Sequence, residues 1–226
     1  MNDVWAQAHK DYSQRDWIDK PSLFAETALP YFPAGVRLLE LGAGQGQDSR
    51  YFATHGFKVV STDGEQAALD LSRSKLSAEL VTKVSLQRVE LREALPFETA
   101  SFGVIYAHLS LHYFDKATTL RLFDEIQRVL KPGGVFAFFV NSVHDPEYKM
   151  GEELEPDFFQ INKMTKRYFS VASAREFTVY FDINLLDDHG ETYKDNAKGV
   201  HNLLRFIGTK KITSTTPDSP SLPRLQ

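Results

Sequence analysis

The sequence predicts an α/β fold: a seven-stranded, mostly parallel sheet with helices on both faces and a C-terminal antiparallel hairpin. Three observations lead to this prediction. Short apolar segments of strand type alternate with helical segments through residues 36–140. The segment 135–140 is nearly all apolar, as expected for a strand buried on both faces. After it, two strand-like segments follow one another with no helical period between them, which favours antiparallel pairing at the sheet edge.

Each element has its own signal along the chain. Ser22 can begin a short helix within the lead-in of residues 1–32, and Pro30 ends it. Gly56 suits the position just after a helix, because glycine tolerates a positive φ. The segment 131–134, Lys-Pro-Gly-Gly, stops a helix and turns the chain into the fifth strand. The expected strands are residues 36–41, 57–62, 84–89, 102–107, 135–140, 177–186 and 201–210, and the expected helices are residues 46–55, 67–76 and 116–130.

Composition limits the classes of function. The net charge is −4 and no basic run is longer than a pair, so nucleic acid is not the expected partner. The chain has no cysteine, which excludes disulfides, thiolate zinc sites and a cysteine nucleophile. No apolar stretch approaches the roughly 18 residues of a membrane span, and the polar N-terminus lacks the apolar core of a signal peptide. We therefore expect a cytoplasmic protein with no membrane contact.

A glycine-rich turn is the strongest local signal. Gly42, Gly44 and Gly46 stand where the first strand passes into a helix, with the spacing G-x-G-x-G. Glycines there let a ligand approach the backbone closely, and the helix N-terminus behind them favours a carboxylate or a phosphate. The dinucleotide fingerprint needs glycine or alanine at position 47, where this chain has Gln47. The spacing therefore fits a ligand with a carboxylate and a nucleoside better than NAD.

Asp63 ends the second strand, 63 − 42 = 21 residues after the first glycine of the turn. An acidic side chain at this position can accept hydrogen bonds from both hydroxyls of a ribose. It can equally serve as the N-cap of the next helix. Because the glycine-rich turn lies beside it, we favour the ribose interpretation and keep the helix cap as the alternative.

Four motifs carry a resemblance to a known family. ELGAGQG is similar to the motif E/DxGxGxG, and VVSTDGE resembles a strand that presents a ribose-binding acid. LREALPFETASFGVIYAHLSLHYF is similar to a block around the fourth strand, with Gly103 where an aspartate is usual, and RVLKPGG resembles the turn before the fifth strand. Together they resemble the class I S-adenosylmethionine-dependent methyltransferases. The resemblance implies a Rossmann-like fold and S-adenosyl-L-methionine as cofactor.

The same resemblance implies roles for individual residues on the cofactor side. The methionine part lies against the glycine-rich turn, the ribose against the end of the second strand, the adenine against the third-strand region and the sulfonium near the fourth strand. The residues so implied are Glu40, Gly42, Ala43, Gly44 and Gly46 for methionine, Asp63, Gly64 and Glu65 for ribose, Glu90, Leu91 and Arg92 for adenine, and Ala107 and His108 for the sulfonium.

A narrower resemblance concerns the methyl acceptor. The pattern of residues 5–22, the segment NSVHDPEY after the fifth strand and the closing HNLLRFIGTKK are similar to the tellurite-resistance-type and thiol methyltransferases. Those enzymes act on small or soft nucleophiles. On this basis we expect one domain over residues 1–212, with residues 1–33 as an N-terminal lid and 141–175 as a substrate-side insert. Within the insert, residues 141–167 are expected to be a loop with one or two helices, and residues 213–226 are expected to be disordered.

Candidate substrate-side residues follow the fourth and fifth strands. His112 can act as a general base if the nucleophile is an amine or a hydroxyl, or it can be a structural residue. His108 and His112 are four residues apart, but no acidic cluster or cysteine accompanies them, so no metal site is expected. Tyr12 and Trp17 either cover the cofactor or pack the N-terminal segment on the sheet. Further candidates, which either contact substrate or cap a loop, are Asn141, His144 and Tyr148.

The sequence thus predicts a methyltransferase that acts on a small-molecule nucleophile by in-line displacement, as a monomer or homodimer. Two alternatives stay open: a methyltransferase acting on a protein or nucleic acid, and a non-catalytic S-adenosylmethionine-binding module. Gln47 disfavours a further class, the NAD-dependent oxidoreductases.

Overall fold

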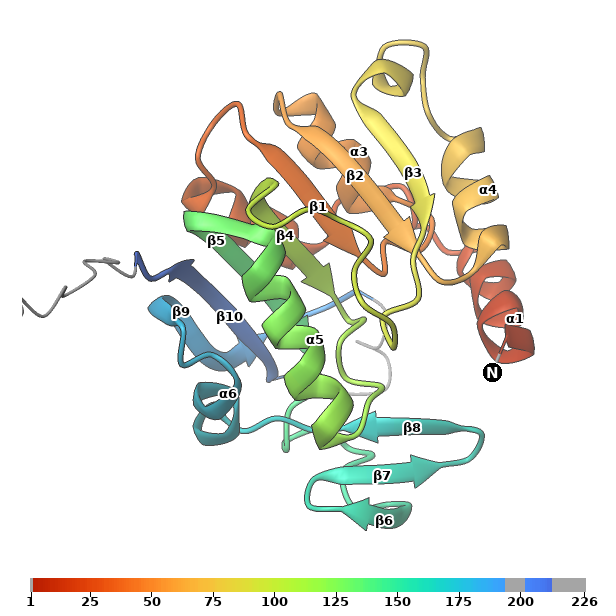
Figure 1. Cartoon of the computed structure of the whole chain (residues 1–226). Helices are drawn as coiled ribbons and strands as arrows, with labels where there is room; N and C mark the ends of the chain where they lie inside the picture. The colour runs from red at the N-terminus through yellow and green to blue at the C-terminus, as the bar shows by residue number, and fades with distance from the viewer. Residues whose placement is uncertain (1, 194–201, 213–226) are drawn as a thin grey trace, which may run out of the picture.

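The computed structural model describes residues 2–193 and 202–212 of the chain. Seven strands form one sheet in the order β3-β2-β1-β4-β5-β10-β9 (Figure 1). The first five strands are parallel, whereas β10 is antiparallel to both β5 and β9. The predicted mostly parallel sheet with a C-terminal antiparallel hairpin is confirmed. Its strands are β1 (Arg37–Leu41), β2 (Lys58–Asp63), β3 (Val84–Arg88), β4 (Phe102–His108), β5 (Leu130–Val140), β9 (Phe181–Gly190) and β10 (Leu203–Lys210).

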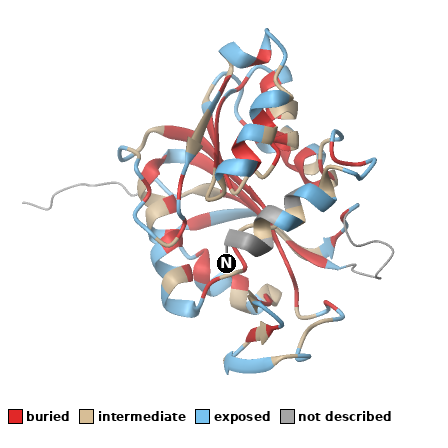
Figure 2. Cartoon of the chain, turned by 90° about the vertical axis from the view of Figure 1, so that its right-hand side faces the viewer, coloured by how far each residue is buried: buried red, intermediate tan, exposed pale blue. Residues whose placement is uncertain are grey.

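Helices cover both faces of the sheet. Every residue of β4 is buried, and successive side chains point to opposite faces. Ile105 packs in the apolar cluster that contains residues of α5 and α6, whereas Tyr106 packs in the cluster that contains residues of α2 and α3. Figure 2 shows the strands of the sheet buried between helices whose outer surfaces are exposed. The helices are α1 (Asn2–Tyr12), α2 (Leu23–Ala28), α3 (Gln47–Thr54), α4 (Gln66–Ser74), α5 (Lys116–Val129) and α6 (Val171–Phe177), with 3₁₀ turns η1 (Leu29–Tyr31) and η2 (Leu80–Thr82).

The insert after β5 is not the expected loop with helices. It forms a three-stranded antiparallel sheet in the order β6-β7-β8, with β6 (Glu152–Glu155), β7 (Phe158–Ile161) and β8 (Met164–Arg167). The strands are only four residues long, and they cover a small apolar cluster of their own. Such short strands show too little alternation to reveal a period of two, which explains why the sequence reads as mixed and polar.

The small sheet lies beyond the carboxyl ends of the parallel strands (Figure 1). Its last strand binds the segment after β4, because Arg167 N donates to His112 O at 2.7 Å and Thr165 Oγ1 donates to Tyr113 O at 3.0 Å. The insert also leaves and rejoins the main fold at one place. Ser142 and Phe169 form a parallel bridge there. The two ends of the insert are therefore adjacent, and the insert lies beside the edge where an open α/β sheet binds its ligands.

The segment before β9 also differs from the prediction. The expected strand over 177–186 starts four residues later, since α6 extends to Phe177. Ser170 and Ser173 form a capping box that starts this helix, in which each side chain meets the backbone of the other. The expected tail over 213–226 lies outside the described residues. Among the residues described, no helix is both long and apolar enough to cross a membrane.

Candidate functional site

The glycine-rich turn lies between β1 and α3. Gly42, Gly44 and Gly46 have φ values of +69°, +56° and +70°, and Gly46 is the N-cap of α3. A Cβ atom on Gly42 would lie 2.3 Å from the Cβ of Ser110, so a side chain would collide with the segment after β4. Gly42 is therefore required for two reasons. Its backbone has a positive φ that L residues rarely adopt, and a side chain there would collide with Ser110.

Asp63 ties the turn to the second strand. Its Oδ2 accepts from Gly44 N at 2.8 Å, and its Oδ1 accepts from Glu65 N at 2.9 Å. Glu65, not Asp63, is the N-cap of α4. Each carboxylate oxygen has a second lone pair, so Asp63 can hold the turn in place and still accept from hydroxyls in the pocket.

Glu40 is buried beneath the turn. The residue is 2% exposed, and its carboxylate accepts a hydrogen bond from Ser49 Oγ. Burial is the main cause that raises the pKa of Glu40 well above its ordinary value, and the negative charge of Asp48 is the second. A carboxyl group that holds its proton in this position can donate as well as accept hydrogen bonds.

Asp48 anchors the N-terminal segment to the sheet. It is 1% exposed, and its carboxylate accepts from Ser22 N and Ser22 Oγ, both at 2.7 Å, and from the Tyr106 hydroxyl at 2.8 Å. Burial raises the pKa of Tyr106, so the phenol stays a donor. The sequence interpretation missed this network, because Asp48 in the first turn of a helix is typical of an ordinary capping position.

One pocket of about 410 Å³ opens above these groups. It brings together most of the residues predicted to form the site, from α1, the glycine-rich turn, and the ends of β2, β3, β4 and β5. Those that line it are Tyr12, Glu40, Gly42, Ala43, Gly44, Asp63, Gly64, Glu65, Glu90, Leu91, Arg92, His108, His112 and Asn141. Their contacts with cofactor or substrate stay predictions.

Five predicted residues lie outside the lining. Gly46 supports the turn from behind, where a Cβ would meet Ser72 Oγ at 2.2 Å, and Ala107 is fully buried in β4. Trp17 is 7% exposed and packs on Tyr12, with ring centroids 5.5 Å apart. The packing interpretation thus suits Trp17 better than the lid interpretation. The two remaining side chains bind acidic partners, since His144 Nε2 lies 2.9 Å from Asp188 Oδ2 and Tyr148 donates to Asp157 at 2.6 Å.

The two histidines occupy different environments. His108 ends β4 and stacks on Phe139, with ring centroids 5.2 Å apart and planes inclined by 3°. His112 is 2% exposed and lies against Tyr113 at 4.2 Å. Its backbone oxygen holds β8 through Arg167 N. No group of three or more potential metal ligands occurs in residues 2–193 and 202–212.

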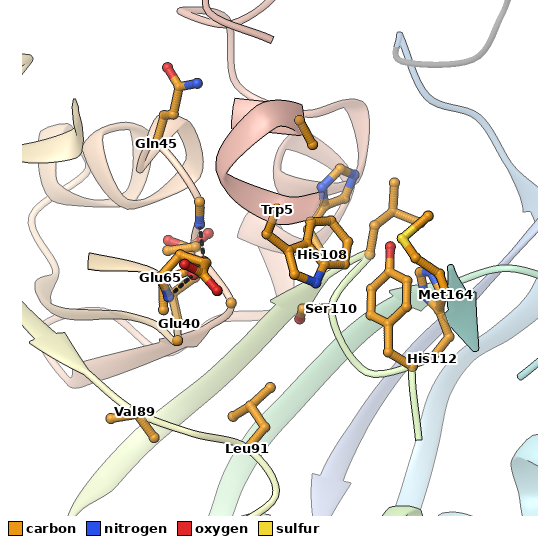
Figure 3. A pocket seen from close by; sticks show the side chains of 18 of the residues that line it. Trp5, Glu40, Gln45, Glu65, Val89, Leu91, His108, Ser110, His112 and Met164 are labelled. Atoms are coloured by element: carbon orange, nitrogen blue, oxygen red, sulfur yellow. Dashed lines mark hydrogen bonds between the residues drawn. The ribbon is translucent and has the colours of Figure 1, made fainter. Parts of the chain in front are cut away.

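Several lining residues escaped the sequence interpretation. Figure 3 shows Trp5 between Glu40 and Glu65 on one side and His112 and Met164 on the other. The Trp5 ring meets Tyr113 edge to face at 4.8 Å. The N-terminal aromatic pattern did point to this region, but nothing in the insert marks its contribution. The lining residues in question are Trp5, Ala8, Ser110, Tyr113, Glu147, Met164, Thr165 and Lys166.

Sequence comparison places residues 39–138 in a family described as a methyltransferase domain. An uncharacterized methyltransferase of Synechocystis sp. is 35% identical over 103 residues, which are 46% of each chain. A malonyl-[acyl-carrier protein] O-methyltransferase of Enterobacter lignolyticus is 27% identical over 137 residues, 60% of this chain and 51% of that one. A sarcosine/dimethylglycine N-methyltransferase of Aphanothece halophytica is 33% identical over 47% of this chain and 38% of its own. The chain spans about half the length of these curated relatives, or less.

Solved structures share the fold. A chain from the Haloferax volcanii complex between the Trm112 methyltransferase activator and a methyltransferase superposes with a TM-score of 0.68 and 22% identity, covering 93% of this chain and 96% of its own. An S-adenosylmethionine-dependent methyltransferase of Methanosarcina mazei superposes with a TM-score of 0.71 and 19% identity, covering 82% of this chain and 97% of its own. At sequence identities of 22% and 19%, these structures show that the fold is shared and do not by themselves assign an activity.

Proposed function

Because the chain belongs to the class I S-adenosylmethionine-dependent methyltransferases, we propose that it transfers a methyl group from this cofactor to a small-molecule nucleophile by in-line displacement. One observation carries the proposal: a single pocket joins the glycine-rich turn and Asp63 to a second compartment lined by His112, Asn141 and the small sheet. Cofactor and acceptor can therefore meet in one pocket, where orientation supplies much of the rate enhancement.

The cofactor side fits S-adenosylmethionine by the chemistry of its donor set. When bound, the cofactor supplies a methyl group already activated on a sulfonium sulfur. Asp63 and Glu65 offer carboxylate acceptors to hydroxyl and ammonium groups, and Val89 and Leu91 offer an apolar wall to a flat base. Glu40 lies at the glycine-rich turn with its pKa raised, where it can donate to a carboxylate or accept from an ammonium.

On the acceptor side, His112 is the candidate proton acceptor. It lines the pocket, it is nearly excluded from water, and the contact from Arg167 N to its backbone fixes the segment that carries it. An amine or a hydroxyl must lose a proton on methylation, whereas a thiolate or oxyanion needs no base. His112 is therefore expected to matter for the first class of nucleophile and to be dispensable for the second.

Enclosure supports a small acceptor. Trp5 and Ala8 of α1 close one side of the pocket and Met164 to Lys166 of β8 close another. One relative bears the name of an enzyme acting on sarcosine or dimethylglycine, which are small molecules, whereas another is named for malonyl-[acyl-carrier protein], an acceptor attached to a protein. The alternative, a protein or nucleic-acid acceptor, is kept because a structural neighbour comes from a complex with the Trm112 methyltransferase activator. The net charge of −4 speaks against nucleic acid.

Two measurements test the proposal. Calorimetry of the full chain should detect S-adenosylmethionine and not NAD, and binding of NAD alone would overturn the cofactor assignment. Transfer of a labelled methyl group should then be followed across thiols, chalcogen oxyanions, amines and carboxylic acids, with total protein and RNA as further acceptors. Label on macromolecules only would favour the alternative, and cofactor binding without any transfer would favour a non-catalytic module.

A further inference from the structure

An ion pair lies within the substrate side of the pocket. Lys166 Nζ of β8 contacts Glu147 Oε2, and both residues line the pocket. The only other ion pair of the described residues with both partners in the lining, Glu90 with Arg92 at 3.9 Å, lies on the predicted adenine side. The Lys166–Glu147 pair therefore places an ammonium and a carboxylate on the side of the pocket that the small sheet lines.

The two partners are unequally buried. The Lys166 side chain is 14% exposed, whereas that of Glu147 is 44% exposed. An ammonium that has left water needs an anion beside it, because an unpaired buried charge is costly. Glu147, in the turn that follows Asp145, can return to water at little cost. The geometry thus holds the cation in the pocket and leaves its present partner replaceable.

The surroundings of Lys166 fit the rest of an organic anion. Met164, on the same strand, and the rings of Trp5 and Tyr113, which meet edge to face at 4.8 Å, supply apolar and aromatic wall. Thr165 uses its hydroxyl to bind Tyr113 O and so fixes β8 against this wall. A flat apolar body with a carboxylate at one end suits such a compartment.

We propose that Lys166 binds the carboxylate of a small organic-acid substrate, which takes the place of Glu147. This inference rests on the proposed function and names its substrate class. Lys166 is then a specificity-determining residue: it selects acids over amides and amines of the same shape. The opposite polarity, in which Glu147 retains an ammonium substrate and Lys166 moves away, is the competing outcome.

The test uses binding, so that it does not depend on identifying the true acceptor. The full chain is first saturated with S-adenosylhomocysteine, measured by calorimetry, and then titrated with benzoate, benzamide and benzylamine while aromatic and methyl NMR signals are followed. Benzoate should bind more tightly than both neutral and cationic analogues. Lys166→Met should weaken benzoate by about tenfold or more, since hydrogen bonds to charged groups are the strong ones, and Lys166→Arg should restore part of the loss.

Two further variants complete the design. Lys163→Met removes an exposed lysine from the same hairpin and should leave benzoate binding unchanged. Glu147→Gln should leave benzoate binding as tight as in the parent or tighter, because the ammonium loses its competing anion. Equal affinity for the three probes, or preference for benzylamine that Glu147→Gln abolishes, would overturn the assignment to carboxylates. If the parent protein does not bind S-adenosylhomocysteine at all, the result would contradict the proposed function and not the assignment of Lys166.

Discussion

Gly42 shows how a single hydrogen atom in place of a side chain shapes the pocket. Its φ of +69° is nearly that of Gly35, +73°, but only Gly42 has a neighbour within reach of a Cβ atom. The pair therefore separates backbone strain from steric collision. Gly35→Ala should cost only about 1 kcal/mol of unfolding free energy, the usual penalty of a left-handed conformation.

Gly42→Ala should cost more, because the new Cβ would lie 2.3 Å from that of Ser110. We expect a further loss of about 1–3 kcal/mol of stability from overpacking, together with weaker binding of S-adenosylhomocysteine. Denaturant unfolding and calorimetry on both variants check this. Equal losses of unfolding free energy in the Gly35→Ala and Gly42→Ala variants would show that the segment after β4 can move to accommodate the new Cβ atom.

Asp63 serves both the fold and the proposed cofactor site. Asp63→Ala removes the acceptor of Gly44 N and Glu65 N, as well as the proposed acceptor of the ribose hydroxyls. Affinity for S-adenosylhomocysteine should fall by about tenfold or more, since each lost hydrogen bond to a charged group is worth about 1.5–3 kcal/mol.

Deoxygenated ligands discriminate the two roles of Asp63. If the carboxylate accepts from the ribose, the analogue that lacks both ribose hydroxyls should bind the parent and Asp63→Ala proteins with similar affinity in calorimetry. A full tenfold difference with that analogue would assign the effect of the substitution to the turn alone.

At the scale of elements, a buried hydroxyl group helps to attach the N-terminal segment to the main sheet. Ser22 caps α2 through Ala25 N at 3.0 Å and also donates to Asp48. Ser170 caps α6 through Ser173 N at the same distance, without a carboxylate partner. Both serines cap a helix, but only Ser22 also donates a hydrogen bond to a buried carboxylate, so the two positions can be compared directly.

Ser170→Ala should therefore cost about 1 kcal/mol, the value of a helix cap. Ser22→Ala should cost about 2–4 kcal/mol, because Asp48 also loses a donor in a buried site. Denaturant midpoints and slopes of both variants measure the difference. Equal losses would mean that water reaches Asp48 once the hydroxyl is gone.

The elements with a regular hydrophobic pattern could be predicted from the sequence, whereas the strands of the small sheet could not. The order from β1 to β5 follows from short apolar segments that alternate with helical ones, and the hairpin of β9 with β10 follows from two strand-like segments with no helical period between them. The small sheet does not, since its strands are four residues long and Glu152–Glu155 is mostly exposed. On the site, the glycine-rich turn and Asp63 lie where the motif implies, but Lys166 could not be found from sequence because only tertiary contacts bring β8 to the pocket.

At the scale of the whole molecule, the buried Glu40 makes stability depend on pH. Its ordinary pKa is 4.5, and burial together with the charge of Asp48 raises the pKa in the folded protein. Between these two values the native state holds a proton that the unfolded state has released. The unfolding free energy therefore falls as pH rises from about 4.5 to the folded pKa, with a slope of up to about 1.4 kcal/mol per pH unit.

Glu40→Gln should abolish this contribution, because the amide does not titrate. Unfolding free energies of parent and variant, measured by denaturant at pH 5, 6, 7 and 8, should diverge in favour of the variant as pH rises. Asp19 works in the opposite direction and in another interval: Lys75 lowers its pKa below 3.8, so its contribution is lost only in more acidic solution. Parallel curves above pH 5 would mean that Glu40 is ionised in the folded protein.

The bridge between Ser142 and Phe169 bears on how the insert can vary among related chains. The insert starts and ends at adjacent points, and it carries a separate apolar cluster under its own strands. Replacing it with a segment of different length requires no change in the distance between its attachment points, and closing a longer loop adds little entropy. Under the proposed function, exchanging the insert between related chains should therefore change the preference for the methyl acceptor and leave the glycine-rich turn and Asp63 unchanged.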